Sequence, residues 1–255
     1  MRRRSSAVKR PIVRRLIIWI GFPLLLVYAA VAVTNYVQSS RAAVERMNSY
    51  LLELTNHHAA VLDSRFKAIS QTPLIIAENI EAMRLLNEPR LYDLMERRLA
   101  IDPGIFGMSI SFEPYALDPG RDRCSPCVFR SAGGLERAGT AGLEAYHTAD
   151  WYLIPELLKS SYWTEPYYSA EGGNALMCTF SHPFFREGAF AGVVTADISL
   201  AELDKTMRGI EIISGYTFLV GRSGTFISHP NPDFVMRESL FSLAEMLDRP
   251  DLRSI

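Results

Sequence analysis

Residues 163–200 decide the fold of this chain, and they read WTEPYYSAEGGNALMCTFSHPFFREGAFAGVVTADISL. Two apolar runs rich in β-forming residues, Ala175–Phe185 and Ala189–Ile198, flank a turn at Glu187-Gly188. A glycine in a short connection between such runs predicts a β-hairpin. The second run contains Asp197, which needs a partner or a ligand because burial of an isolated charge is costly.

The N-terminus is basic and is followed by an apolar segment. Residues 1–15 contain seven of the 27 basic residues, whereas the rest of the chain holds all 28 acidic residues. Residues 16–37 carry no charge and are long enough to cross a bilayer as a helix. The positive-inside rule then predicts a cytoplasmic basic tail at 1–15, a signal anchor at 16–37 in the cell inner membrane, and an extracytoplasmic (periplasmic) remainder. The acidic excess of that remainder argues against nucleic acid as a partner.

A cleaved signal peptide is the alternative interpretation of the apolar segment. Ala30-Val31-Ala32 has the small-residue pattern of a cleavage site, and cleavage would release a secreted periplasmic binding protein. The apolar run is longer than the roughly 7–15 residues of a usual signal-peptide core, which favours an uncleaved anchor. Both interpretations export the folded part.

The sequence predicts helices before strands. Apolar residues at heptad-like spacing predict one long helix from residue 38 to about 71, ended or bent by Pro73. Their stripe is either a homodimer seam or the packing face of an ordinary amphipathic helix. A second helical region covers about 74–100, with a break near Asn87-Glu88-Pro89.

The later elements predict an α+β fold with an antiparallel, PAS-like sheet. Alternation of apolar and polar residues at Ile105–Glu113 predicts a half-buried strand. Residues 114–145 predict a long loop with one short strand at Cys127–Arg130. The remaining predicted elements are a short helix at Asp150–Ser161, a helix at Leu200–Ile213 capped by Ser199, a hairpin formed by 216–221 and 225–228, and a weakly helical tail.

Aromatic residues crowd into one segment, and they indicate a recognition site. The candidate ligand-binding residues are Tyr146, Trp151, Tyr152, Trp163 and Tyr167, together with Asp197 on the later strand. Aromatic rings with a few polar groups suit a small-ligand pocket, and rings near an acid suit a cation. An aromatic core beneath a loop is the alternative for any single ring.

Cys124 and Cys127 are a candidate disulfide pair, because the exported side of a membrane is oxidising. Free thiols remain the alternative, and a zinc site would need a second pair of ligands. Cys178 lies in a predicted strand and suits a small buried apolar position. No cofactor or metal is predicted.

An ordered set of motifs resembles the double-Cache sensor domain, the extracytoplasmic ligand-binding module of bacterial receptors. The motifs are Trp151-Tyr152, Trp163-x-x-Pro166-Tyr167, His182-Pro183 and Gly192-Val193-Val194-x-x-Asp197-Ile198. Residues 215–230 resemble the first hairpin of the membrane-proximal half. The resemblance covers about residues 38–240. Within it, the amino-acid sequence of the hairpin most resembles Cache regions of SpoIIE-type serine/threonine phosphatases.

The resemblance implies a long helix with a membrane-distal Cache module at 38–205 and the start of a membrane-proximal module at 206–255. It also implies that the chain is a fragment of a longer receptor with a cytoplasmic output domain. In amino-acid-binding members, Trp151, Tyr167 and Asp197 match ligand-binding positions. The arginine that holds the ligand carboxylate is replaced by Ala149. The expected ligand is therefore a small organic molecule, an amine or amino-acid-like.

The expected function is sensing, in which ligand-biased rearrangement passes to an output domain such as a phosphatase or a histidine kinase. The sequence lacks the motifs of nucleophile elbows, phosphate-binding loops and zinc proteases, so these residues are not expected to form an enzyme. A ligandless structural or dimerisation module of a membrane-anchored regulator is the alternative function.

Overall fold

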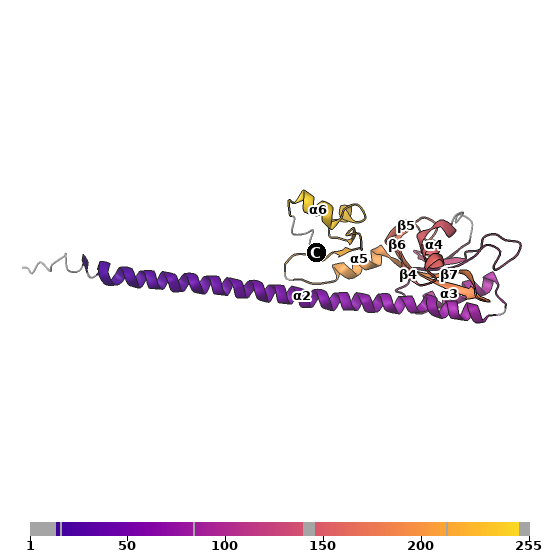
Figure 1. Cartoon of the computed structure of the whole chain (residues 1–255), viewed down its shortest axis with the longest axis horizontal. Helices are drawn as coiled ribbons and strands as arrows, with labels where there is room; N and C mark the ends of the chain where they lie inside the picture. Colours follow the sequence, from indigo (N-terminus) through magenta and orange to yellow (C-terminus); the bar gives the residue numbers. More distant parts are fainter. Residues whose placement is uncertain (1–13, 16, 84, 140–145, 213, 250–255) are drawn as a thin grey trace, which may run out of the picture. The chain divides into compact units, whose positions relative to one another are not determined.

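A computed structural model describes residues 14–15, 17–83, 85–139, 146–212 and 214–249. The chain divides into two compact units, residues 1–64 and residues 65–255. The long helix α2 (Phe22–Ala82), drawn in indigo to magenta in Figure 1, contributes residues to both units.

The first unit consists of a short π-helical turn, η1 (Ile17–Gly21), and the N-terminal part of α2. Pro23 is the second residue of α2, which follows η1 without a break. The helical segment that begins at Ile17 is long and apolar enough to cross a membrane, and none of its most apolar window is buried. Its length and composition therefore agree with the predicted membrane segment.

The prediction that Pro73 ends or bends the long helix is wrong about the end, because α2 continues to Ala82. A proline inside a helix removes one backbone hydrogen bond and costs about 3 kcal/mol. Here Pro73 is buried beside Ile69 and Ile76, so the packing of this helix face offsets that cost. The predicted break near Asn87 is confirmed, because Asn87 caps α3 (Glu88–Ile101) by accepting a hydrogen bond from the Arg90 N–H at 3.1 Å.

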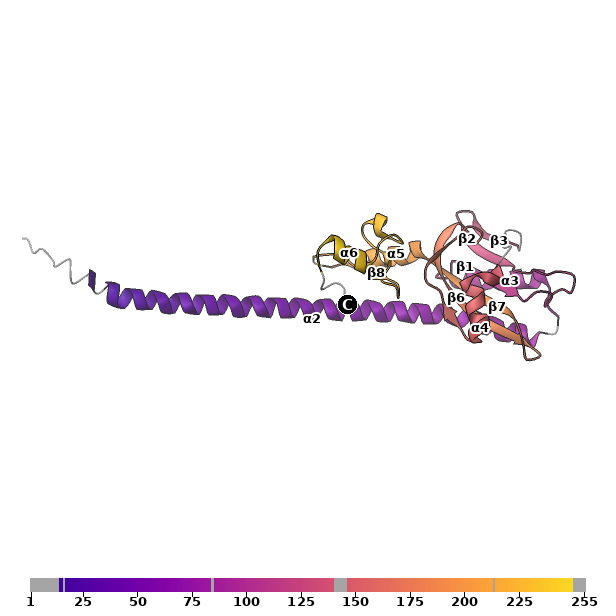
Figure 2. The same cartoon turned by 45° about the horizontal axis from the view of Figure 1, so that its top comes forward.

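The second unit is built on one antiparallel sheet, and Figure 2 shows its strands beside α3 and α4. The strand order is β3-β2-β1-β7-β6-β4, and β5 also pairs with β6. The strands are β1 (Gly107–Phe112), β2 (Cys127–Ser131), β3 (Gly134–Ala138), β4 (Tyr162–Trp163), β5 (Tyr167–Ser169), β6 (Ala175–Arg186) and β7 (Ala189–Ser199). The predicted α+β class and the central hairpin, β6 and β7, are confirmed.

The two faces of this sheet differ in chemistry. Residues directly opposite each other in antiparallel strands share a face, and successive residues alternate between faces. One face carries apolar residues such as Met108 and Ile110 on β1, paired with Ala196 and Val194 on β7. The other face carries Ser109, Thr179, Ser181, Thr195 and Asp197. Trp163 belongs to the apolar side, because its ring contacts Phe66 of α2 and Phe180 of β6.

The polar face is covered by α4 (Asp150–Leu158), which packs against β6 and β7, and by the turn η2 (Tyr146–Thr148) before it. Strand β1 is consequently buried at all six positions. The sequence predicted a half-buried strand, since polar alternation usually marks a face in water. In this fold α4 and η2 cover the polar side of β1, so that side does not face water.

Two further elements differ from the predictions. The predicted loop at 114–145 contains a second strand, β3, which pairs with β2; residues 140–145 of that loop lie outside the described part. Helix α5 (Leu200–Arg208) is shorter than predicted and ends at Gly209. Its predicted cap is confirmed, because the Ser199 side chain accepts a hydrogen bond from the Glu202 N–H.

The C-terminal part contains the second predicted hairpin, with strands β8 (Leu219–Val220) and β9 (Phe226–Ser228) shorter than predicted. A 3-10 turn η3 (Pro232–Phe234) and the helix α6 (Leu240–Met246) follow. Ser228 donates a hydrogen bond to the Asp204 carboxylate at 2.7 Å, which ties β9 to α5.

The turn between β6 and β7 holds two residues in the left-handed region, Glu187 at φ 53° and Gly188 at φ 81°. Arg186 and Ala189 pair directly, so the loop has two residues and positive φ at both. Such a loop favours Asn-Gly, because a side chain other than that of Asn or Asp is disfavoured at positive φ.

We expect Glu187→Asn to stabilise the chain by about 0.5–1 kcal/mol, because asparagine tolerates the left-handed conformation better than glutamate. Gly188→Ala should destabilise it by about 1 kcal/mol or more for the converse reason. Urea unfolding in detergent micelles, followed by circular dichroism, measures both changes. Equal stability of the two variants would contradict the assigned turn.

Candidate ligand-binding site

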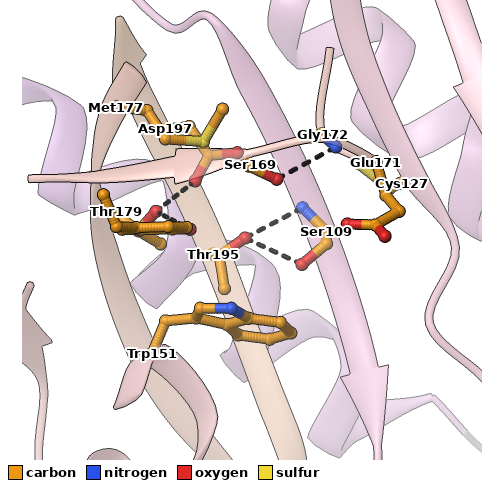
Figure 3. A pocket seen from close by; sticks show the side chains of 11 residues that line it. Ser109, Cys127, Trp151, Ser169, Glu171, Gly172, Met177, Thr179, Thr195 and Asp197 are labelled. Carbon is orange, nitrogen blue, oxygen red and sulfur yellow. Dashed lines mark hydrogen bonds between the residues drawn. The ribbon is translucent and has the colours of Figure 1, made fainter. Parts of the chain in front are cut away.

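A small cavity lies on the polar face of the sheet, beneath α4 and the β5–β6 turn (Figure 3). Its volume is about 40 Å³. The residues that line it are Ser109, Cys127, Trp151, Tyr167, Ser169, Glu171, Gly172, Met177, Thr179, Thr195 and Asp197. They come from β1, β2, α4, β5, β6, β7 and the turn, so segments far apart in the sequence build one site.

Asp197 lies at the centre of a chain of hydrogen bonds. The Thr179 hydroxyl donates to a carboxylate oxygen of Asp197 at 2.7 Å. The Tyr167 and Thr179 hydroxyl oxygens are also 2.7 Å apart. Since the Thr179 hydrogen is directed to Asp197, Tyr167 is the donor to Thr179. Tyr167 and Asp197 are thereby fixed relative to each other across β5, β6 and β7.

Burial shifts the pKa values of this group. Asp197 is only 7% exposed, and desolvation raises the pKa of its carboxyl from 3.8 to about 7, although the Thr179 hydrogen bond acts in the opposite direction. The pKa of the Tyr167 hydroxyl is raised by burial and, to a smaller extent, by the Asp197 charge. Both shifts have the same origin, the removal of a charged form from water.

Gly107 leaves space for the Asp197 carboxylate, a role that the sequence analysis missed. The two residues pair directly between β1 and β7. A Cβ atom on Gly107 would lie 2.9 Å from one Asp197 carboxylate oxygen and 3.3 Å from the Phe129 Cβ. A larger residue here would press on the carboxylate. The available signal was a glycine inside an alternating strand, which often marks a close approach.

Ser109 and Thr195 form the neighbouring row of the cavity floor, and the sequence analysis also missed them. The Ser109 N–H donates to the Thr195 hydroxyl oxygen at 3.0 Å, and their hydroxyl oxygens are 2.8 Å apart. Both side chains are buried. In the sequence, these residues belong to two runs in which polar and apolar residues alternate. A strand with one face in water has the same pattern, so the sequence does not distinguish the two cases.

The β5–β6 turn closes the cavity on another side. The Ser169 hydroxyl accepts a hydrogen bond from the Gly172 N–H at 3.0 Å. Between them, Glu171 directs its carboxylate toward Ser109 (Figure 3). Asp197 lies on the other side of the space, so two carboxylates face the cavity.

The six predicted ligand-binding residues divide into two groups. Trp151, Tyr167 and Asp197 line the cavity. Tyr146 and Tyr152 instead belong to a buried cluster with Val193, and Trp163 lies on the opposite face of the sheet.

Hydrogen bonds account for the positions of the two buried tyrosines. The Tyr146 hydroxyl donates to the Phe112 carbonyl at 2.6 Å, and the Tyr152 hydroxyl donates to the Glu113 carboxylate at 2.8 Å. Tyr146 is also stacked on Trp151, with ring centroids 6.3 Å apart. The structure therefore places these tyrosines behind the cavity wall, where they support Trp151.

The predicted disulfide between Cys124 and Cys127 is absent, because both are buried free thiols. Their side chains have different surroundings: Cys127 lines the cavity near Asp197, whereas charges of Glu88 and Arg121 act on Cys124. Burial raises the pKa of Cys124 to about 11 and that of Cys127 still further. Cys178 is also a free buried thiol, in agreement with its predicted position.

Comparison with known proteins agrees with this fold. Residues 91–205 match the family model described as "Methyl-accepting chemotaxis protein-like, first PDC sensor domain". The methyl-accepting chemotaxis protein PscA of Pseudomonas syringae pv. tomato (strain ATCC BAA-871 / DC3000) is 33% identical over 88 residues, which are 34% of this chain and 14% of that protein. The chain therefore matches only a small part of this curated relative.

Solved structures show the same architecture. The extracellular domain of mmHK1S-Z3, described as a histidine kinase, is 25% identical at a TM-score of 0.65, over 76% of each chain. The structure named methyl-accepting chemotaxis protein X is 20% identical at a TM-score of 0.64, over 82% of this chain and 84% of that one. The ligand-binding domain of Pseudomonas aeruginosa PAO1 PctC, solved with GABA, is 18% identical at a TM-score of 0.58, over 79% and 83%.

Residues 91–205 are therefore an extracytoplasmic small-molecule sensor domain of the PDC (Cache) class, as the sequence resemblance predicted. The family is one of sensors and not of enzymes, so the predicted absence of catalysis is confirmed for this domain. Together with the N-terminal apolar helix, the match makes the chain a membrane protein with an extracytoplasmic sensor domain. The closer likeness to phosphatase-associated Cache regions remains a prediction.

We expect the contribution of Asp197 to the stability of the chain to fall as pH rises from about 4 to 7. The folded state raises the Asp197 pKa from 3.8 to about 7, so between these values it binds more protons than the unfolded state. Asp197→Asn removes the titrating group and with it this loss of stability. The free energy of unfolding of the variant, relative to that of the parent chain, should therefore rise by roughly 2–3 kcal/mol between pH 5 and pH 8. Urea unfolding in detergent micelles measures the difference. Parallel pH profiles would show that Asp197 is not held in a desolvated state.

Proposed function

We propose that this chain is the sensor region of a transmembrane signal-transduction receptor of the bacterial inner membrane. In this proposal residues 1–15 are a cytoplasmic tail, 16–37 the anchor, 38–205 the long helix with the membrane-distal module, and 206–255 the start of a membrane-proximal module. The basic tail beside the apolar helix supports this orientation through the positive-inside rule.

The proposed ligand is a small organic molecule, an amine or amino-acid-like, that binds in the cavity beside Asp197. The observation that carries the proposal is the convergence of Trp151, Tyr167 and Asp197 on one covered space. A few polar groups among aromatic walls are typical of small-molecule sites. PctC, a structural relative, was solved with GABA, which supports a ligand of this size.

The cavity has a physical connection to the long helix. Asp197 lies two residues before Ser199, which caps α5. At the other end of α5, the Thr206 hydroxyl accepts a hydrogen bond from the Arg65 guanidinium of α2 at 3.1 Å. A ligand that shifts β7 is expected to act on α2 through this helix, provided that it binds two conformations with different affinity.

The cavity is smaller than a usual ligand pocket, so binding of a ligand has to be tested directly. Ligand pockets usually have volumes of several hundred Å³, whereas this cavity measures about 40 Å³. A sensor must therefore widen the cavity on binding. A ligandless structural module is the second candidate function, and the small volume favours it.

Calorimetry of the full chain in nanodiscs against amines, amino acids and carboxylates separates these two functions. A sensor is expected to bind at least one compound, and Trp151→Ala combined with Asp197→Asn should weaken that binding at least about 100-fold, through loss of an aromatic wall and a charge. Tyr168→Ala is the matched control, because Tyr168 adjoins Tyr167 but is 58% exposed. Absence of any heat signal across the set would support the structural module.

The proposal includes a homodimer formed through α2. Val44, Met47 and Leu51 are spaced by three and four residues and are exposed on the helix of the first unit. Spacing of this kind buries a continuous apolar stripe when a second helix packs against it. A second copy of the chain is the proposed occupant.

Cross-linking of intact cells tests both the dimer and the side of the membrane. Leu51→Cys should cross-link rapidly with a membrane-impermeant bifunctional maleimide, because a seam brings the two copies of residue 51 together outside the cytoplasm. Glu53→Cys, on the other side of the helix, should cross-link at least about fivefold more slowly. Equal rates would count against the seam, and labelling only after cell lysis would reverse the proposed orientation.

A further inference from the structure

A second cavity lies between the C-terminal end of α5 and the end of β9, and it shares no lining residue with the cavity beside Asp197. Its volume is about 620 Å³, which is within the usual range of small-molecule pockets. Two hydrogen bonds join its sides: the Thr217 hydroxyl donates to the Met207 carbonyl at 3.0 Å, and the Ser228 hydroxyl donates to the Asp204 carboxylate at 2.7 Å. The position of α5 relative to β9 is therefore fixed around this space.

A buried histidine in the lining of this cavity has a hydrogen-bond donor without a partner. His229 is 5% exposed, and its Nδ1 atom accepts a hydrogen bond from the Asn231 N–H at 3.0 Å, whereas the Asn231 carbonyl oxygen is 3.3 Å away. A histidine ring that accepts at Nδ1 carries its hydrogen on Nε2. Within the part of the chain that the structure describes, the buried Nε2 atom of His229 has no hydrogen-bond partner. A molecule in the cavity that supplies an acceptor would satisfy this donor.

Aromatic rings hold the His229 imidazole in place. The ring centroids of Phe226 and Phe234 lie 4.9 Å and 4.8 Å from that of the imidazole. Tyr216, which also lines the cavity, meets the imidazole edge to face with centroids 5.1 Å apart. The rings and the hydrogen bond from Asn231 orient the histidine before a ligand arrives, which lowers the ordering cost of binding.

The other lining groups suit an uncharged ligand. The hydroxyl groups of Thr217 and Ser228 already donate within the protein. The Arg208 guanidinium is paired with the Asp204 carboxylate at 2.6 Å, and both Arg208 and Glu211 are exposed to water. A carboxylate in the covered part of the cavity would therefore lack a dedicated cation, which makes its burial costly. The apolar lining residues at the end of α5 and after it are Met207, Ile210 and Ile212.

We propose that this cavity is a second ligand site, for a small uncharged molecule with an apolar body and one hydrogen-bond acceptor such as a ketone carbonyl. His229 Nε2 donates to the acceptor, and the apolar walls enclose the body. The site does not depend on the ligand proposed beside Asp197. Met207 adjoins Thr206, which contacts Arg65 of α2, so an occupant would act on the same connection to the long helix.

Photolabelling of the full chain in nanodiscs with benzophenone tests the proposal. Benzophenone is an aromatic ketone of the proposed class, and on irradiation it inserts into nearby C–H bonds. Peptide mass spectrometry is expected to find the label within residues 207–217 or 228–230.

Competition by molecules of matched shape tests the hydrogen bond. Acetophenone should displace benzophenone at about tenfold lower free concentration than α-methylstyrene, in which a CH₂ group replaces the carbonyl oxygen. Benzoate, which is of similar size but charged, should compete at least about tenfold less well than acetophenone.

Variants test the role of the histidine. His229→Phe keeps an aromatic ring but removes the donor, so acetophenone should lose its advantage over α-methylstyrene. His229→Gln places an amide N–H near the position of Nε2 and should keep most of that advantage. His57→Phe is the matched control, because it replaces an exposed histidine of α2, and it should change neither competition. Circular dichroism checks that each variant is folded.

Three outcomes would overturn the inference. Labelling confined to other peptides would remove the site. Equal competition by acetophenone and α-methylstyrene in the parent chain would remove the role of His229, even where His229→Phe does not fold. Competition by benzoate at or below the concentration needed for acetophenone would reverse the proposed ligand class. None of these results bears on the cavity beside Asp197, which calorimetry tests separately.

Discussion

Burial of the Asp197 carboxylate is the constraint on which the rest of this sensor domain depends. A charge removed from water must be neutralised, hydrogen-bonded or paired. Here Thr179 donates to it, Tyr167 orients Thr179, and Gly107 leaves it room. These groups belong to four strands, so one buried acid sets requirements on β1, β5, β6 and β7 together. Burial raises the pKa of this carboxyl to about 7, and the Thr179 hydrogen bond offsets only part of that desolvation.

The two faces of the sheet have different roles: one packs in the apolar core, and the other lines the cavity. Its apolar face packs through residues such as Met108, Ile110 and Val194, whereas its polar face supplies the floor of the cavity. Strict alternation along antiparallel strands makes this division possible, because neighbouring residues of one strand point to opposite faces. Substitutions on the polar face can therefore change ligand chemistry with little change in the apolar core. A shared fold can in this way serve different ligands.

The route from the cavity to the long helix is short. β7 carries Asp197 and runs directly into the cap of α5, and α5 contacts α2 through Thr206 and Arg65. The cavity measures about 40 Å³, which is far below the several hundred Å³ of usual ligand pockets, so the residues around it would have to move to admit a ligand. Differential affinity between two arrangements of the domain is the only source of free energy for such a change.

The sequence by itself determined the local elements and the class of the protein. The Glu187-Gly188 turn, the apolar runs on either side and the Ser199 cap are short-range signals, and each forms where it was predicted. The motif order was sufficient to identify a Cache sensor, and three of the predicted site residues, Trp151, Tyr167 and Asp197, line one cavity. Local signals succeed here because hairpins and caps depend on residues close together in the chain.

Only the tertiary structure decided which polar and aromatic residues share the cavity. Ser109 and Thr195 had the pattern of an exposed strand face, and the covering helix α4 turned that face into a cavity floor. Tyr146 and Tyr152 lay in the predicted aromatic set, yet hydrogen bonds to Phe112 and Glu113 hold them behind the wall. Pro73 continued a helix because burial of its neighbours offsets its local cost. In the first two cases the deciding contact joins residues distant in sequence, and periodicity carries no information about such contacts.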